Sequence, residues 1–188
     1  MALADTLHAK PSASPSIRPT IASHLTFTAF SALALLLMYS LLRGALLIYN
    51  RELMGDTPAS TFVEAFYNGM RFDLRVVVYA CIPLLLALFS VRAMAARRAL
   101  RWWLTGFASL TLFLALTELD FYREFHQRLN SLVFQYMQED LGTVSSMIWN
   151  GFPVLRLLLV WALATAVLAW LFRRIERATR ARSHAPAP

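Results

Sequence analysis

The sequence predicts an all-α integral membrane protein, a bundle of four transmembrane helices with an amphipathic interfacial helix in the second outer loop. The 188-residue chain is 58% hydrophobic and 15% charged, whereas soluble domains carry about 25% charged residues. Its mean hydropathy is +0.51. Four long windows without charge are separated by short segments that contain arginine. Together these observations place the chain among membrane proteins, as one domain.

The four windows predict spans near residues 25–49, 75–96, 101–120 and 153–173. A spanning helix needs about 20 mostly apolar residues, and arginines at the ends of a shorter window can extend toward the membrane surface. Arg43, the deepest charge, is expected to extend outward in this way. The first window could also be a signal peptide, but it is longer than the usual apolar region and no small-residue cleavage site follows it.

Arginine counts predict the topology. If the N-terminus is cytoplasmic, eleven of the 18 basic residues lie in cytoplasmic segments and seven lie outside. The positive-inside rule favours this orientation, with both termini cytoplasmic. Residues 1–24 are then a disordered cytoplasmic tail, 25–173 the transmembrane domain, and 174–188 a basic cytoplasmic tail suited to anionic lipid.

Two longer outer loops remain, 50–74 and 121–152. In the first, the spacing of Thr61 and Glu64 resembles a capping box and predicts a short amphipathic helix over about 60–70. In the second, aromatic and polar residues alternate with helical period over 121–138. This pattern predicts an amphipathic helix that lies in the membrane interface.

Charged residues gather where these loops meet the spans, and they have two interpretations. They are interfacial decoration with local ion pairs, or they form a polar floor that binds lipid headgroups or docks a domain. Arginine suits the second role because its planar guanidinium binds phosphate through two hydrogen bonds. The candidate residues are Arg71, Asp73, Arg75, Asp120, Arg123, Arg128 and Asn130.

The sequence contains no recognisable catalytic or metal-binding motif. There is no G-x-S-x-G, P-loop or H-E-x-x-H pattern, and the four histidines lack ligand spacing. The single cysteine, Cys81, lies in an apolar run and is interpreted as a packing residue. The basic residues cluster between apolar windows, so membrane topology explains them better than nucleic-acid binding. We therefore expect no catalytic residue, metal site or cofactor in this chain.

Three motifs carry a resemblance to a known family: NGMRFDLR (68–75), ELDFYREFHQRLN (118–130) and SMIWNGFP (146–153). Their order resembles the N-terminal membrane region of bacterial lipoteichoic-acid-synthase-like proteins, over about 25–173. These are phosphoglycerol transferases and sulfatase-like enzymes of the alkaline phosphatase superfamily. The resemblance implies a bundle of usually five spans and a large extracytoplasmic domain. That domain carries a divalent metal and a threonine nucleophile, and it transfers phosphoglycerol or related headgroup units to glycan or glycolipid acceptors.

This chain departs from the family pattern because it shows four spans and no catalytic domain. We expect the membrane-anchor portion of such an enzyme, as a shortened product or a fragment, in the bacterial cytoplasmic membrane and not catalytic on its own. Its expected partners are the phospholipid bilayer and a full-length relative or catalytic partner. One alternative is a non-enzymatic scaffold that binds a partner. Another is a small transporter component, which the absence of mid-membrane charge and of an inverted repeat disfavours.

Overall fold

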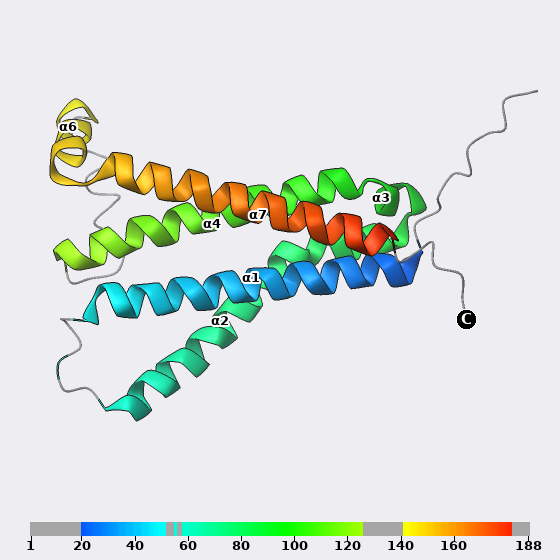
Figure 1. Ribbon diagram of the computed structural model, residues 1–188, viewed down its shortest axis with the longest axis horizontal. Helices are drawn as coiled ribbons and strands as arrows, with labels where there is room; N and C mark the ends of the chain where they lie inside the picture. The colour runs from blue at the N-terminus through cyan, green and yellow to red at the C-terminus, as the bar shows by residue number, and fades with distance from the viewer. Residues whose placement is uncertain (1–19, 52–54, 56–57, 126–140, 182–188) are drawn as a thin grey trace, which may run out of the picture.

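The computed structural model describes residues 20–51, 55, 58–125 and 141–181, and it is helical through most of these ranges (Figure 1). Four helices are long and apolar enough to cross a membrane, which confirms the predicted fold class. The long helices are α1 (Ile21–Tyr49), α2 (Ala59–Leu86), α4 (Arg97–Phe125) and α7 (Val154–Ala181). The short elements are η2 (Ala87–Phe89), α3 (Val91–Ala95) and α6 (Leu141–Gly151).

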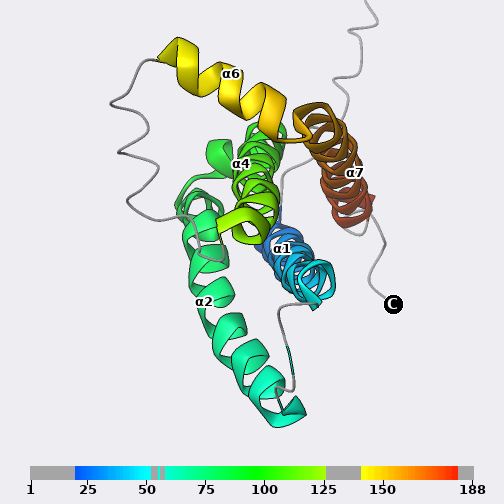
Figure 2. The ribbon, with the colours of Figure 1, turned by 90° about the vertical axis from the view of Figure 1, so that its left-hand side faces the viewer.

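The long helices run alternately up and down the bundle, so their ends gather at two places (Figure 1). We call one place the Tyr49 end, where α1 and α4 finish and α7 begins, and the other the His24 end. Helix α6 lies at the Tyr49 end, across the long helices (Figure 2). The first half of α2 leaves the bundle at the same end, whereas its second half packs between α1 and α4 (Figures 1 and 2).

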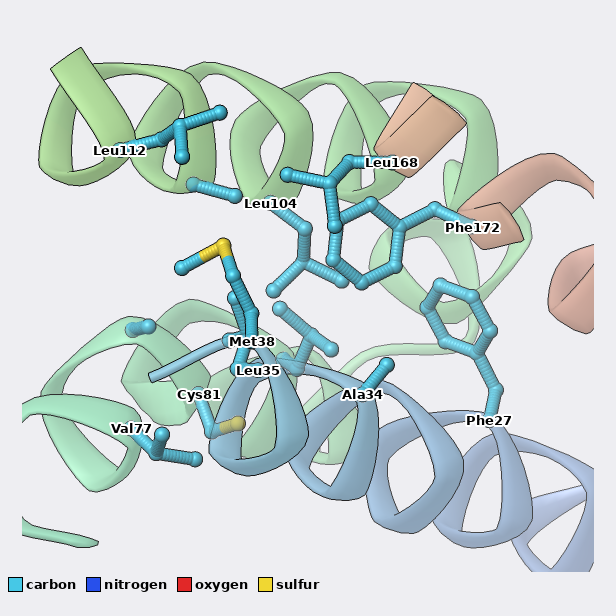
Figure 3. Close-up of a cluster of buried hydrophobic side chains, with 13 residues drawn as sticks. Phe27, Ala34, Leu35, Met38, Val77, Cys81, Leu104, Leu112, Leu168 and Phe172 are labelled. Atoms are coloured by element: carbon cyan, nitrogen blue, oxygen red, sulfur yellow. The ribbon is translucent and has the colours of Figure 1, made fainter. Parts of the chain in front are cut away.

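The interior of the bundle is a continuous apolar cluster to which all four long helices contribute (Figure 3). Phe27, Leu35, Leu84, Leu104 and Phe172 are each fully buried in it. The outward faces are apolar as well, with large aliphatic side chains exposed along α1 and α7. A helix that is apolar on every face suits a hydrocarbon surrounding, so both the core and the surface fit a lipid bilayer.

Helix α2 begins much earlier than the sequence predicts. The chain is helical without interruption from Ala59 into the span. The predictions of a separate short helix over 60–70 and of a loop over 50–74 are therefore wrong from residue 59 onward. Pro58 precedes the first turn, and its carbonyl accepts the Thr61 N–H at 3.1 Å without any side-chain cap. No proline interrupts the following turns before Pro83, so the amphipathic segment and the span form one helix.

The other boundaries also differ. The predicted span over 75–96 is broken at Ser90, whose hydroxyl accepts the Ala93 N–H at 3.5 Å and starts α3. Helix α1 begins at Ile21 and α7 continues to Ala181. The predicted tail over 1–24 therefore ends inside α1, and the predicted tail over 174–188 begins inside α7.

Most of the predicted interfacial helix over 121–138 lies outside the described residues. Its first five residues form the last turn of α4. Further along the same loop, the structure shows α6, which the sequence analysis did not predict.

Candidate functional site

An arginine–carboxylate pair joins α1 to α2 near the Tyr49 end. One terminal nitrogen of Arg43, Nη2, donates to both Asp73 Oδ1 and Oδ2 at 2.9 Å. The two side chains are 23% and 15% exposed, so the pair is largely shielded. A charge inside a membrane helix is costly unless it is paired. Arg43 therefore has a partner on α2, which the prediction that it extends outward did not include.

Gly69 makes room for this pair. It lies one helical turn before Asp73 on α2, and a Cβ atom added to it would collide with the Arg43 guanidinium. The absence of a side chain lets the planar guanidinium lie against the α2 backbone. Gly69 belongs to the NGMRFDLR motif, and this contact gives the glycine a structural purpose that the sequence analysis did not identify.

We expect Gly69→Ala to weaken the Arg43–Asp73 pair because the new methyl group displaces the guanidinium. The expected loss is about 1–3 kcal/mol in the free energy of unfolding, measured in mixed detergent micelles. Gly106→Ala is the matched control, since a Cβ there meets nothing within 4 Å. Equal stability of the two variants would contradict this role.

A second polar group, which we call the Tyr49 cluster, consists of Tyr49, Asp120 and Arg156. The Tyr49 hydroxyl donates to Asp120 Oδ1 at 3.0 Å, and Arg156 Nη2 donates to the Tyr49 hydroxyl at 3.0 Å. Arg156 Nη2 lies 3.8 Å from Asp120 Oδ1, and the Arg156 side chain is 62% exposed. The cluster connects α1, α4 and α7 at the rim of the bundle, so three of the four long helices are fixed together there.

The structure divides the predicted site residues into two groups. Asp73 on α2 binds Arg43, and Asp120 on α4 lies in the separate Tyr49 cluster with Arg156. Arg71 and Arg75 are exposed on α2, and the Arg75 guanidinium lies 5.0 Å from the centroid of the Phe72 ring.

Three predicted residues have no described side-chain environment. Arg123 belongs to the last turn of α4, and Arg128 and Asn130 lie outside the described residues. The partners that hold the acids, Arg43 and Arg156, were not predicted as site residues. For Arg43, the available signal was its position inside an apolar window, where a charge needs a counter-charge. For Arg156, no local pattern pointed to Asp120.

At the His24 end, Arg97 is buried among neutral partners, with 2% of its surface exposed. Its Nη2 donates to Ser23 Oγ at 2.7 Å and its Nη1 to Thr179 Oγ1 at 3.4 Å. Ser23 Oγ in turn donates to the Thr179 carbonyl at 2.7 Å. One arginine thus links α1, α4 and α7 through hydroxyl groups.

Next to Arg97, Glu176 holds two further arginines. Its carboxylate lies 3.2 Å from Arg101 Nη1 and 2.8 Å from Arg180 Nη2, and the glutamate side chain is 9% exposed. Glu176 was placed in a tail by the sequence analysis, yet it lies inside the helical bundle because α7 extends past it.

His24 completes this end of the bundle by capping α2. Its Nε2 donates to the Leu84 carbonyl at 2.8 Å. Leu84 belongs to the last turn of α2, where carbonyl groups have no partner within the helix. The imidazole therefore supplies a hydrogen-bond donor to a backbone carbonyl near the end of α2.

The contacts of these clusters hold the helices of the bundle together. Among the described residues, no group of three histidine, cysteine or acidic side chains is placed to hold a metal ion. Asp73 and Asp120 are both engaged with arginines. Cys81 is buried within the apolar core, in agreement with its interpretation as a packing residue. Searches against protein-family models, curated proteins and solved structures found no match to this chain.

Proposed function

We propose that this chain is the membrane-anchor portion of a bacterial phosphoglycerol transferase or sulfatase-like enzyme. In this proposal the Tyr49 end faces the outside of the cytoplasmic membrane and supports a catalytic domain. The divalent metal and the nucleophile belong to that domain. This portion acts on phospholipid headgroups only together with it.

One observation carries the proposal: the acidic residues of two family-like motifs are both held by arginines near the same end of the bundle. Asp73 binds Arg43, and Asp120 binds Arg156 and Tyr49. These contacts fix α1, α2, α4 and α7 relative to one another. A rigid rim of this kind supports a docked domain, and the exposed Arg71 and Arg75 suit headgroup phosphates beside it.

The distribution of arginines supports the orientation. Eight arginines lie at the His24 end within the described helices α3, α4 and α7, and the positive-inside rule places such an end in the cytoplasm. We expect green fluorescent protein fused after Pro188 to fluoresce and alkaline phosphatase at the same position to stay inactive. Fusions within residues 126–140 should give the opposite pair of results, and an active phosphatase after Pro188 would reverse the orientation.

The first test of function is the size of the native product, measured with an N-terminal epitope tag at the genomic locus. A band much larger than 21.3 kDa supports the anchor proposal. Arg71→Ala combined with Arg75→Ala in that larger product should then lower phosphoglycerol transfer while membrane insertion stays normal, with Arg51→Ala as control. A band near 21.3 kDa, or unchanged transfer, argues against it.

A non-enzymatic scaffold is the second candidate, and the first half of α2 favours it. This half extends beyond the bundle (Figure 2) and exposes Val63, Tyr67 and Phe72 at 69%, 60% and 61%. A partner helix packed there would cover these side chains. Photo-crosslinking from position 67 should trap one protein partner if the scaffold proposal is correct, and only lipid if the anchor proposal is correct.

A further inference from the structure

The His24 end carries far more positive charge than its own carboxylates can neutralise. Within the described residues of this end, Glu176 is the only acidic side chain, and it is already bound by Arg101 and Arg180. Arg97 has only neutral hydroxyl partners among the contacts described above. Among the described residues of this end, no carboxylate other than that of Glu176 is present to neutralise the exposed Arg173 and Arg177 on α7.

Three of these arginines lie on one face of α7. Arg173, Arg177 and Arg180 follow one another at intervals of four and three residues, which places them on the same side of a helix. The first two are exposed, and the Arg180 side chain is 50% exposed. Glu176 binds both Arg180 and Arg101 on α4, so Arg180 lies beside the α4–α7 contact. The helical spacing places Arg173 and Arg177 in a row with it on the same side of α7.

The same face of α7 is apolar along the rest of its length. Leu155, Leu159, Leu163 and Trp170 precede the arginines at intervals of three, four or seven residues, and they are 64%, 71%, 69% and 58% exposed. From Leu163 to Arg173 the helix extends about 15 Å at 1.5 Å per residue, which is close to half of the roughly 30 Å thickness of the hydrocarbon core. The Arg174 guanidinium lies 5.6 Å from the Trp170 ring centroid, as is common where hydrocarbon meets headgroups.

We propose that this face of α7 binds an anionic phospholipid. The acyl chain lies along Trp170 and Leu163, and the phosphate is bound by Arg173, Arg177 and Arg180. A phospholipid fits better than free phosphate because the apolar strip leads directly into the arginine row. An anionic headgroup fits better than a zwitterionic one because the site has surplus positive charge, and the carboxylate of Glu176 is already bound by Arg101 and Arg180. The site lies at the opposite end from the proposed docking rim and is independent of that function.

The test is a binding titration on the purified full chain in neutral detergent. Fluorescent phosphatidylglycerol and phosphatidylcholine with the same acyl chains are compared by anisotropy, and glycerol phosphate is added as a competitor. The variant Arg173→Gln/Arg177→Gln removes two arginines of the row. The matched control Arg51→Gln/Arg92→Gln removes two exposed arginines elsewhere, and circular dichroism checks that both variants remain helical.

We expect phosphatidylglycerol to bind at least about tenfold more tightly than phosphatidylcholine. The variant in the row should weaken its binding by about thirtyfold, as expected for two arginines near an anionic headgroup. The control should change it by less than about threefold, since its arginines lie outside the row. Equal binding of the two lipids, an equal loss in both variants, or displacement by glycerol phosphate at concentrations comparable to the lipid would each overturn the proposal.

Discussion

Replacing Glu176 by glutamine is expected to lower the free energy of unfolding by about 3–5 kcal/mol, the range for removing one partner of a buried ion pair. The carboxylate is 9% exposed and is shared by Arg101 and Arg180. Glutamine keeps the size of the side chain but removes its charge. Three arginines, including the buried Arg97, would then repel one another in a low-dielectric setting without a counter-charge.

Equilibrium unfolding in mixed detergent micelles measures this effect. Glu64→Gln is the control because Glu64 is exposed on α2, where loss of a charge is expected to cost less than about 0.5 kcal/mol. A loss below about 1 kcal/mol for Glu176→Gln would show that the cluster contributes little to stability.

Asp73→Leu is the second large effect, with an expected loss of about 2–4 kcal/mol because Arg43 stays in the bundle without its partner. The double variant Arg43→Met/Asp73→Leu should recover most of this stability, since two apolar side chains suit the site between α1 and α2. Neutral contacts between membrane helices, such as that of Tyr39 with Thr111 at 3.0 Å, contribute only about 0.6 kcal/mol on average. The charged pair should therefore dominate the response.

The measurement is a double-mutant cycle on unfolding free energy, with Arg75→Met combined with Asp73→Leu as control. Arg75 is exposed and lies over Phe72 rather than at Asp73, so its removal should not rescue the variant. A coupling energy near zero between Arg43 and Asp73 would contradict the pairing as a source of stability.

The four spans could be predicted because hydrocarbon imposes a simple requirement of length and apolarity on each helix. Helix ends could not, because they depend on local capping and on packing. The second span ends at Phe89, and Ser90 then starts α3 through one hydroxyl contact. Past the expected end of the fourth span, α7 continues because Glu176 and Thr179 have partners on α4 and α1.

The candidate site could also be predicted only in part from the sequence. Asp73 and Asp120 were identified from their place beside apolar windows, and both take part in polar clusters. Their partners come from other helices: Arg43 lies 30 residues from Asp73, and Arg156 contacts Tyr49 across 107 residues. Sequence spacing carries no information on such pairs until the order of helices in the bundle is known.

The contact between Ser23 and Thr179 spans 156 residues, and it has a consequence for how the protein is made. During synthesis, α1 leaves the ribosome long before the residues around Thr179 exist. Until then, Ser23 and Arg97 lack a partner that the finished bundle supplies. Closure of the His24 end is therefore a late step that waits for α7. The entropy lost when this long connection is closed is paid at that step. Helices inserted earlier form a provisional assembly, in which a chaperone or lipid headgroups can shield the arginine until α7 arrives.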